Sequence, residues 1–375
     1  MKREMIPMFY PHVPESAINK LAETLRSRWI GQGPKVDEFE REFSKKFGLK
    51  YVVSLNSGTS ALRLALALIG VGPGDEVIST PYTAVATNTA ILEQFAKPVF
   101  ADIQYETANL DPADIERHIT DKTKAIVCVH WGGYPCDMDE IRKIASDYGL
   151  PVIEDAAHAL GAKYKGKPIG AISEYTIFSF QAIKHITTGD GGMLCLMDEK
   201  KYKEAVRRRW FGIDRAARKP SVLGHDPTYD IKEVGYKYHM NDIAATIGIE
   251  QLKYFDSLFR RRAEIAKRYR EELEGINGIT LLENKQDRVH ANWLFGIHVN
   301  KRMKFARWMR ERRIEVSVHN WRNDKYTIFG GLRKDLPNLE RVDNDLICIP
   351  LHHKLSDEDV DYIIKAIKEF GRANK

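Results

Sequence analysis

The sequence predicts an α/β fold in which a mostly parallel sheet is covered by helices on both faces, followed by a small α+β domain. From residue 51 onward, short runs rich in β-branched residues alternate with amphipathic stretches, which is typical of parallel strands joined by helices. After Gly192 this rhythm gives way to long helical patterns. A chain of 375 residues is also too long for one small core, which favours a large domain and a smaller one.

The first part of the chain contains seven strand candidates and the helical patterns that connect most of them. The strand candidates are YVVSL, DEVIST, PVFAD, TKAIVCVH, PVIED, YTIFSF and GGMLCLM. The helical patterns cover residues 59–69, 84–95, 112–118 and 137–148. Strands that alternate with helices in this way are expected to lie in one sheet with helices on its two faces.

The second part of the chain predicts two long helices and then the small domain. The long helical patterns cover residues 199–211 and 241–274, and Gly275 and Gly278 follow them. The remaining elements are the strands WLFGIHV, IEVSVH and LICIP and the helices 303–312 and 357–370. We therefore predict a large domain over residues 1–250, including the N-terminal segment, and a small C-terminal domain over residues 251–375.

The composition is that of an ordinary globular protein, with 43% hydrophobic and 29% charged residues. The net charge of +6 comes largely from the arginine clusters 207–209, 260–262 and 310–313. Carboxylates lie near each cluster in a helical pattern, so the clusters form solvated helix faces or attract a small phosphate-bearing substrate. The chain contains no recognised nucleic-acid module, and no nucleic-acid partner is expected.

The sequence also argues against a membrane protein, a disulfide framework and a metal site. Its start lacks the apolar region of a signal peptide, and no apolar run reaches the ~20 residues that a membrane span needs. A cytoplasmic protein is expected. The four cysteines form no CxxC pair, so we expect buried, reduced thiols and no metal ion.

A possible anion site follows the first strand, in the run SLNSGTSAL. Ser57, Gly58 and Thr59 are small residues at the start of a predicted helix, where unpaired amides and the helix dipole favour a phosphate. The same residues also suit an ordinary helix N-cap, because Ser and Thr bond to those amides. This run alone does not separate the two interpretations.

A buried carboxylate is predicted at the end of the strand PVIED. Asp155 there needs a cation or strong donors, because an unpaired buried charge is costly. Its partner is either a structural arginine or the protonated ring nitrogen of a heterocycle. His158 follows three residues later and is either a core histidine or a second group of the site.

Lys184 lies just beyond the strand YTIFSF, in a turn rich in Thr and Gly. A free lysine has a pKa of about 10.4 and is a poor nucleophile at neutral pH unless its surroundings lower that value. Pyridoxal phosphate needs a lysine for its aldehyde, a carboxylate for its ring nitrogen and donors for its phosphate. Lys184, Asp155 and Thr59 offer these three contacts at three strand ends, so pyridoxal phosphate is the predicted cofactor.

Four runs carry a resemblance to a known family: SLNSGTSALRLALALIGVGPGDEVISTP, VIEDAAHALGA, FSFQAIKHITTGDGG and NDIAATIGIEQL. The chain resembles the DegT/DnrJ/EryC1/StrS family of pyridoxal-phosphate-dependent sugar aminotransferases, from WIGQGPKVDEFE to IPLHHKLSDEDVDYI. The resemblance implies the aspartate-aminotransferase fold (fold type I) with a seven-stranded sheet. It also implies a homodimer whose active sites are completed across the interface.

The resemblance also assigns roles to single residues. It implies that Lys184 forms the internal aldimine and then moves the proton, and that Asp155 keeps the pyridine nitrogen protonated. It places His158 near the ring, and Ser179 with Gly58 and Thr59 at the phosphate. The family positions that approach the substrate correspond here to Trp29, Ile30, Gly33, His319, Asn320 and Arg322, and each of these residues is either a substrate contact or a structural residue.

The sequence departs from the family pattern at two places. Ala84 stands where many relatives carry an aromatic residue that stacks on the cofactor ring, and Tyr82 is a candidate to replace it. Lys237 and His239 stand where the family has Asn and Arg. Lys237 is thus either a ligand of the partner subunit's cofactor phosphate or an exposed interface lysine.

We expect transfer of an amino group from L-glutamate to the ketone of a nucleotide-linked keto-deoxy sugar, in two ping-pong half-reactions. Within the same chemistry, the alternatives are amination of a small phosphorylated ketone and a sugar dehydratase; relatives that dehydrate replace the lysine with histidine, whereas Lys184 is kept here beside His185. A regulatory protein of the same fold would be expected to lack Lys184 or Asp155. A nicotinamide-dependent oxidoreductase is disfavoured because no GxGxxG follows the first strand.

Overall fold

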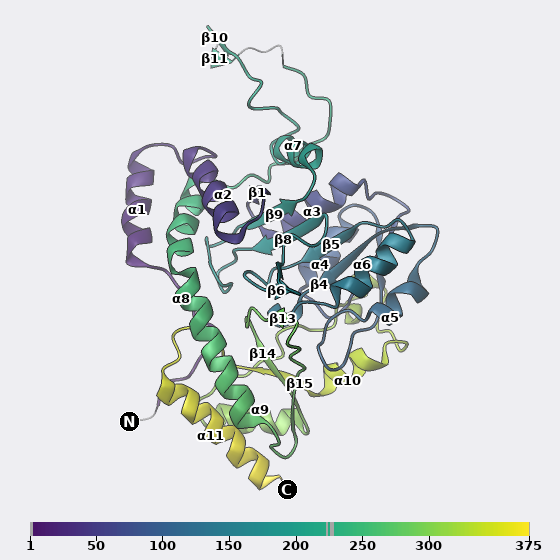
Figure 1. The fold of residues 1–375 in the computed structure, drawn as a ribbon, viewed down its shortest axis with the longest axis vertical. Helices are drawn as coiled ribbons and strands as arrows, with labels where there is room; N and C mark the ends of the chain where they lie inside the picture. Colours follow the sequence, from purple (N-terminus) through teal and green to yellow (C-terminus); the bar gives the residue numbers. More distant parts are fainter. Residues whose placement is uncertain (1–2, 223, 226–228, 375) are drawn as a thin grey trace.

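The computed structural model describes residues 3–222, 224–225 and 229–374, and its centre is a seven-stranded sheet (Figure 1). The strand order is β1-β9-β8-β5-β4-β2-β3. Only β9 runs opposite to its neighbours, so the other six strands are parallel. The strands are β1 (Tyr51–Leu55), β2 (Glu76–Ser79), β3 (Lys97–Phe100), β4 (Thr123–Val129), β5 (Val152–Asp155), β8 (Tyr175–Ser179) and β9 (Gly192–Leu196). All seven predicted strands are confirmed.

Helices cover both faces of this sheet, as the alternating sequence pattern predicts. The α-helices are α1 (Glu15–Arg26), α2 (Pro34–Phe47), α3 (Gly58–Ile69), α4 (Val85–Leu92), α5 (Pro112–Ile115), α6 (Met138–Asp147), α7 (Glu199–Arg208), α8 (Asp242–Leu273), α9 (Arg302–Glu311), α10 (Pro337–Asp345) and α11 (Asp357–Ala373). Helices α1, α2 and α10 lie outside the predicted elements.

The two faces of the sheet belong to two separate hydrophobic clusters, because successive strand residues point to opposite sides. Val52 and Cys128 pack in the cluster that includes α2, α6 and α8. Val53 and Val127, their direct neighbours in the chain, pack in the cluster that includes α3, α4 and α7. Apolar side chains thus cover both faces of the sheet. The polar groups that can reach a ligand lie at the strand ends.

The C-terminal part has its own sheet, in the order β12-β14-β15, formed by Ile279–Leu281, Phe295–Val299 and Leu346–Ile349. Helix α8 joins this part to the large sheet without a break. Phe255 in its first half packs in the cluster that includes α2 and α6, whereas Tyr269 in its second half packs with the C-terminal elements. The division near residue 250 therefore stays a prediction, because it falls inside a continuous helix.

The predicted strand IEVSVH is wrong. Residues 314–319 form only single bridges, from Ile314 to Ile6 and from Ser317 to Cys348. The β-branched residues of this run suggest a strand, but residues 316–319 are all partly exposed and do not alternate. Short pairs form the remaining strands: β6 (Lys163–Tyr164), β7 (Lys167–Pro168), β10 (Pro220–Ser221), β11 (Gly224–His225) and β13 (Arg288–Val289).

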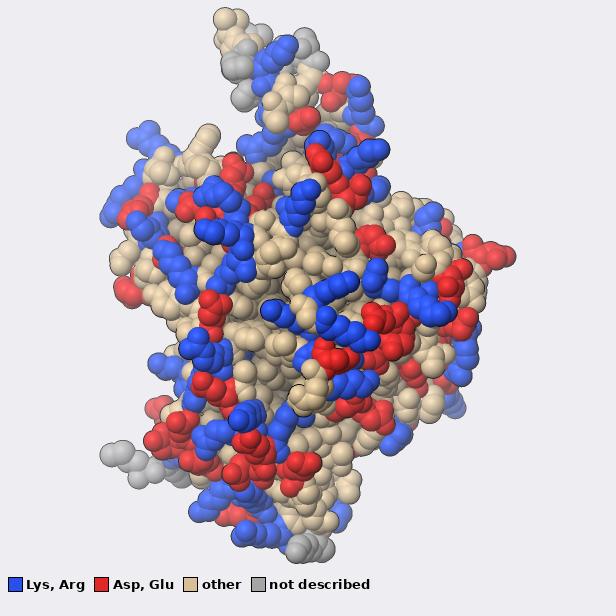
Figure 2. Space-filling model, viewed as in Figure 1, with Lys and Arg blue, Asp and Glu red and all other residues tan. Residues whose placement is uncertain are grey.

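The surface charges are mixed, and the face drawn in Figure 2 shows basic and acidic side chains side by side. In the arginine clusters, Arg207 pairs with Glu233 at 2.6 Å and Arg208 pairs with Glu204 at 3.0 Å. These contacts favour solvated helix faces for the exposed arginines. The interpretation is wrong for Arg209 and Arg262, which are each 3% exposed and bond to Glu40 and to Leu351 O, respectively. Across the described residues, no helix is long and apolar enough to cross a membrane. All four cysteines are free and buried.

Candidate active site

A cavity of about 290 Å³ opens where β1, β5 and β8 end and where α3 and α4 begin. This is the position at which an α/β sheet binds its ligands. The cavity brings together most of the site residues predicted from the sequence: Ser57, Gly58, Thr59, Asp155, His158, Ser179, Lys184 and His319. Residues more than 260 positions apart in the chain therefore line one space.

Lys184 lines the cavity, is only partly exposed, and carries an unpaired amine. Its backbone N–H bonds to Gln181 in the turn after β8, at 2.9 Å. Across the described residues, Nζ makes no hydrogen bond or ion pair, and it lies 3.8 Å from the centroid of the Trp293 ring. Burial lowers the pKa of Lys184 to about 7, against the opposing charge of Asp155. A substantial share of this amine is therefore neutral near pH 7, as a nucleophile must be.

Asp155 ends the buried strand β5 and is held by two donors. The Thr87 hydroxyl donates to Oδ2 at 2.7 Å, and the Ala157 N–H donates to Oδ1 at 3.1 Å. Burial raises the pKa of Asp155, while the two donors and the charge of Lys184 oppose that rise. No arginine pairs with Asp155 in the described structure, which removes the structural-arginine interpretation. Its carboxylate can accept a proton-bearing ring nitrogen.

The turn before α3 agrees with both interpretations made from the sequence, because it caps the helix and also lines the cavity where a phosphate would bind. Ser57 is the N-cap of α3, and its Oγ accepts a hydrogen bond from Ser60 N at 3.0 Å. The same turn also lines the cavity. A Cβ on Gly58 would lie 3.0 Å from Ser179 Cβ, and one on Gly192 would lie 2.4 Å from Ser57 O. Glycine therefore lets the turn, Ser179 and β9 approach closely around the first amides of the helix.

His158 and His319 line the cavity as neutral rings. Burial, and then the charge of Lys184, holds the pKa of His158 well below its usual range. The same two causes lower the pKa of His319 to about 4. His158 Nδ1 is buried and has no hydrogen-bond partner in the described structure. An unpaired buried nitrogen beside a cavity is expected to bond to a ligand there.

These residues fit pyridoxal phosphate. The unpaired Lys184 amine suits the aldehyde, Asp155 suits the ring nitrogen, and the orphaned His158 Nδ1 suits a polar substituent of the ring. The amides at the start of α3, with Ser57 and Ser179 beside them, suit the phosphate.

Six predicted site residues lie outside this cavity: Trp29, Ile30, Gly33, Lys237, Asn320 and Arg322. The Gly33 N–H donates to Asp242 at 2.8 Å, and the fully buried Arg322 donates to Asp324 at 2.7 Å. Trp29 and Ile30 are 54% and 49% exposed, in the segment before α2. Asn320 is buried and accepts a hydrogen bond from Trp131 Nε1 at 3.2 Å. Lys237 Nζ lies 4.7 Å from the centroid of the Trp210 ring. Asn320 is enclosed within this chain, whereas Trp29 and Ile30 are exposed, and the roles of all these residues stay predictions.

The candidate aromatic replacement for Ala84 is wrong. Tyr82 is only 1% exposed and packs on Trp131, with ring centroids 5.8 Å apart, and it does not line the cavity. Ala84 itself does line the cavity. The side chains of this loop that face the site are thus small, and the ring nearest to Lys184 comes from the C-terminal part of the chain.

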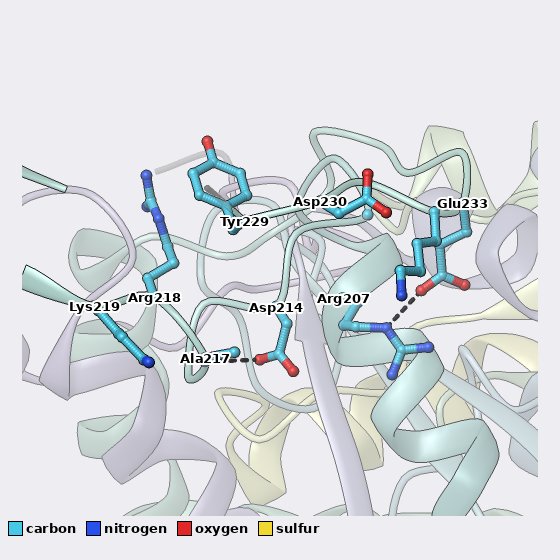
Figure 3. Close-up of a pocket in the computed structure, with 10 residues that line it drawn as sticks. Arg207, Asp214, Ala217, Arg218, Lys219, Tyr229, Asp230 and Glu233 are labelled. Atoms are coloured by element: carbon cyan, nitrogen blue, oxygen red, sulfur yellow. Dashed lines mark hydrogen bonds and ion pairs between the residues drawn. The ribbon is translucent and has the colours of Figure 1, made fainter. Parts of the chain in front are cut away.

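A larger cavity of about 560 Å³ lies between α7 and the loop that follows it (Figure 3). Two of its charged residues, Arg207 and Glu233, pair with each other, and Asp214 accepts the N–H of Ala217 at 3.2 Å. Its described lining contains no end of a strand of the seven-stranded sheet. Size alone therefore does not make it the candidate site.

Two residues of the site, Thr87 and Trp293, are not among those predicted from the sequence. Thr87 lies three residues after Ala84, but nothing in this stretch indicates that its hydroxyl reaches β5. Trp293 lies at the start of the run WLFGIHV, which reads as a strand. Only the tertiary structure brings it against Lys184 and against His158, whose ring centroid is 3.7 Å from that of Trp293.

Comparison with known proteins identifies the family. The model of the DegT/DnrJ/EryC1/StrS aminotransferase family matches residues 11–368. The spore coat polysaccharide biosynthesis protein SpsC of Bacillus subtilis is 37% identical over 98% of this chain and 97% of its own. The UDP-4-amino-4-deoxy-L-arabinose–oxoglutarate aminotransferase of Shewanella sediminis is 36% identical over 98% of this chain and 99% of its own.

Solved structures agree with this match. The crystal structure of AtS13 from Actinomadura melliaura superposes with a TM-score of 0.94 at 38% identity, over 98% of this chain and 99% of the other. The PLP-form of Spr1654 from Streptococcus pneumoniae gives a TM-score of 0.91 at 33% identity, over 98% of this chain and 99% of the other. The fold predicted from the sequence is therefore confirmed.

Proposed function

Since this chain belongs to the DegT/DnrJ/EryC1/StrS aminotransferase family and is a pyridoxal-phosphate-dependent sugar aminotransferase, we propose that it moves the amino group of L-glutamate to the ketone of a nucleotide-linked keto-deoxy sugar. The observation that carries the proposal is the unpaired amine of Lys184 beside Asp155 and the start of α3.

The name of one relative supports this choice of donor and acceptor. The enzyme of Shewanella sediminis is named for a UDP-linked amino sugar and for oxoglutarate. Oxoglutarate is the 2-oxo acid that glutamate becomes when it gives up its amino group. We carry both partners to this chain because the match covers nearly all of each protein.

When bound, the cofactor supplies an aldehyde that condenses with amines and a ring that accepts the electron pair left by proton removal. Lys184 Nζ would be the anchor of the cofactor and would become free when the donor binds. Its freed Nζ then takes the proton from the α-carbon of the donor. In the second half-reaction the same Nζ gives a proton back on the way to the aminated sugar, so Lys184 is both anchor and general acid/base.

Asp155 and the start of α3 hold the cofactor in place during these steps. The Asp155 carboxylate keeps the ring nitrogen protonated, which favours electron withdrawal into the ring. Thr87 and Ala157 orient that carboxylate. The amides of Gly58 and Thr59, together with Ser57 and Ser179, would hold the phosphate. His319 lies on the cavity wall, where we assign it to the acceptor.

The homodimer is part of the proposal. Trp29 and Ile30 are large apolar side chains that this chain alone leaves half exposed. We assign them, with Lys237, to a shared site in which the two subunits meet around the substrate. Sedimentation of the purified chain should give twice the 43.0 kDa of one chain, and a monomer would contradict the shared site.

The alternative of a sugar dehydratase, which uses the same cofactor, differs from transamination at the anchoring residue. A dehydratase would need a histidine in place of the anchoring lysine. His185 is buried, and its Nε2 lies 2.8 Å from Ala291 O, outside the cavity. His185 therefore cannot take over from Lys184 without a rearrangement, which favours transamination.

The acceptor is tested by a panel with one common donor. Purified enzyme with L-glutamate is offered nucleotide-linked keto-deoxy sugars and small keto phosphates, and oxoglutarate release is measured. We expect turnover with at least one nucleotide sugar and at least tenfold lower kcat/KM with every keto phosphate. Preference for a keto phosphate would replace the acceptor but leave the amino-transfer chemistry in place.

Thr87→Val should reduce kcat/KM by roughly tenfold, because it removes a hydrogen bond to a buried charged group. That hydrogen bond lowers the pKa of Asp155, so its loss raises this pKa further. The acid limb of the pH–rate profile should therefore move to higher pH. Thr89→Val is the matched control on the same helix, since the Thr89 hydroxyl bonds to its own helix at Val85 O, at 3.0 Å. Equal profiles for the two variants would contradict the assignment.

Binding of the cofactor should itself titrate near neutral pH. The cofactor-free chain is mixed with pyridoxal phosphate at pH 5 to 10, and the rate of covalent attachment is measured. Only the neutral amine attacks an aldehyde, so the rate should rise with pH through a midpoint near the Lys184 pKa of about 7. A midpoint near the value of about 10.4 for free lysine would contradict the burial argument.

A further inference from the structure

Trp293 lies behind the reacting groups and is not exposed at all. Its indole contacts Lys184 Nζ at 3.8 Å and stacks on His158 at 3.7 Å between ring centroids. His319 meets the same ring edge-on at 4.6 Å. Three side chains of the cavity wall thus pack on one tryptophan.

The indole is fixed by its own polar contacts. Its Nε1–H donates to Ile183 O at 3.0 Å, so the ring is tied to the residue just before Lys184. Its backbone N–H donates to Gly132 O at 2.9 Å. Gly133 has a φ of 95° and sits so close that an added Cβ would lie 2.5 Å from His158 O. Only glycine permits this approach.

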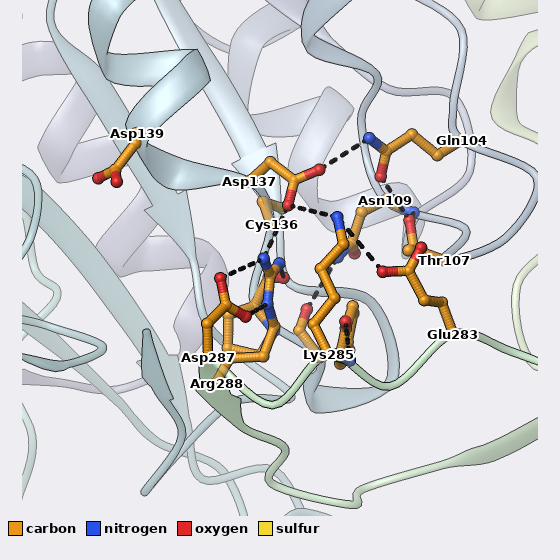
Figure 4. Close-up of polar contacts among 12 residues, drawn as sticks. Gln104, Thr107, Asn109, Cys136, Asp137, Asp139, Glu283, Lys285, Asp287 and Arg288 are labelled. Atoms are coloured by element: carbon orange, nitrogen blue, oxygen red, sulfur yellow. Dashed lines mark hydrogen bonds and ion pairs between the residues drawn. The ribbon is translucent and has the colours of Figure 1, made fainter. Parts of the chain in front are cut away.

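A partly buried network of ion pairs holds residues 285–288, which precede Trp293 (Figure 4). Asp137, at the start of α6, accepts Arg288 at 2.9 Å, Lys285 at 3.3 Å and the Gln104 amide at 2.9 Å. Arg288 also donates to Pro135 O at 2.9 Å. The chain that leads to Trp293 is therefore anchored to the large sheet, and the indole has a defined position.

The proposed reaction places a positive charge on Lys184, and the indole of Trp293 lies where it can stabilise that charge. While Lys184 carries the proton between two carbons, its amine is a poorly solvated ammonium ion. Across the described residues it has no hydrogen-bond acceptor, and the nearest carboxylate, Asp155, is already bonded to Thr87 and Ala157. The face of a tryptophan is the best aromatic partner for a cation.

We propose that Trp293 is a positioning residue of transamination, whose indole face binds the Lys184 ammonium each time the amine is free and holds the ring of His158 beside it. This inference rests on the proposed function of Lys184. The other titratable groups that face the amine are Asp155, His158, His185 and His319.

These neighbours determine the direction of the expected effect. Burial lowers the pKa of all three histidines, so they are neutral and do not compete for the indole as cations. Asp155 raises the pKa of Lys184, and the indole face adds to that effect because it stabilises the charged form. Removing the indole should lower the pKa of Lys184 by about one unit.

The test titrates Lys184 in the full-length chain after removal of the cofactor. Trace acetylation with acetic anhydride is measured by mass spectrometry on the peptide that contains Lys184, from pH 5 to 10. Trp293→Leu should lower the midpoint by about one pKa unit, and Trp293→Phe by less, because phenylalanine keeps a weaker aromatic face. In the loaded enzyme, Trp293→Phe should lower kcat more than it changes KM for the donor.

Trp308→Leu is the matched control. Trp308 also has a cation over its ring, Arg312, and also donates its Nε1–H to a backbone carbonyl, Ala366 O, at 2.9 Å. Trp308→Leu should leave the pH midpoint of Lys184 acetylation unchanged. A folded Trp293→Leu with the wild-type midpoint would overturn the proposal. If that variant does not fold, Trp293→Phe decides, since a lowered midpoint supports the proposal and an unchanged one overturns it.

A separate measurement keeps this inference apart from the proposed function. Borohydride trapping of pyridoxal phosphate on Lys184 is carried out in the wild type and in both Trp293 variants. If pyridoxal phosphate is trapped on Lys184 in all three proteins and the acetylation midpoint of Lys184 is unchanged, only the role of Trp293 is overturned. No trapping on Lys184 in the wild type overturns the proposed function as well.

Discussion

Lys184→Ala should reduce turnover by roughly 10⁴-fold or more, because it removes the anchor and the general acid/base together. The fold should remain, since no hydrogen bond or ion pair in the described structure depends on Nζ. The variant also relieves the cost of a desolvated amine whose pKa has fallen to about 7. The measurements are oxoglutarate release with the accepted keto sugar and the melting temperature of the cofactor-free chain.

The matched control for this prediction is Lys167→Ala, which removes an exposed lysine in β7. It should retain wild-type turnover. A Lys184→Ala variant that melts like the wild type and retains more than about one per cent of its turnover would show that another group does the proton transfer.

Asp155→Asn should reduce kcat by on the order of 10²–10³-fold, because the ring nitrogen loses the negative charge that keeps it protonated. The amide oxygen can still accept the Thr87 hydroxyl, which bonds to Asp155 at 2.7 Å in the wild type. The shape of the site is therefore retained while its charge changes. Asp155 also raises the pKa of Lys184, so the variant should move that pKa below about 7.

Glu154→Gln provides the contrast to Asp155→Asn. Glu154 is the previous residue of β5 and points to the other face, where it bonds to His130 at 2.9 Å and to Ser173 N at 2.8 Å. Its substitution should lower stability without altering the absorption of the bound cofactor. If the two variants had the same effect on kcat, charge at the ring nitrogen would not be the reason for the loss.

The sequence predicts the large sheet well because its signal is local. Each strand is a short β-branched run buried on both faces, and each connecting helix has its own period. The run IEVSVH has the same local signal, but only single bridges to Ile6 and Cys348 form there. Whether such a run becomes a strand depends on whether a neighbour pairs with it along its length, and this information is not in the run itself.

The site residues that follow strand ends were predictable from the sequence. The residues that reach the site only through tertiary packing were not. Asp155 and Lys184 follow buried strands, so their types and positions indicate a site. Trp293 is distant in sequence and reaches Lys184 only because the Asp137–Arg288 network and the Gly132–Gly133 turn hold its segment against the large sheet. Tyr82 was the local candidate for an aromatic partner, and it packs on Trp131 instead.

The most direct test of the account is the absorption spectrum of the wild type and of Lys184→Ala with pyridoxal phosphate, before and after addition of L-glutamate. The account predicts a visible band in the wild type that bleaches with glutamate, and no borohydride-reducible attachment in the variant. A wild type without the band, or a variant with the same reducible attachment, would contradict the assignment of Lys184 and with it the proposed amino transfer.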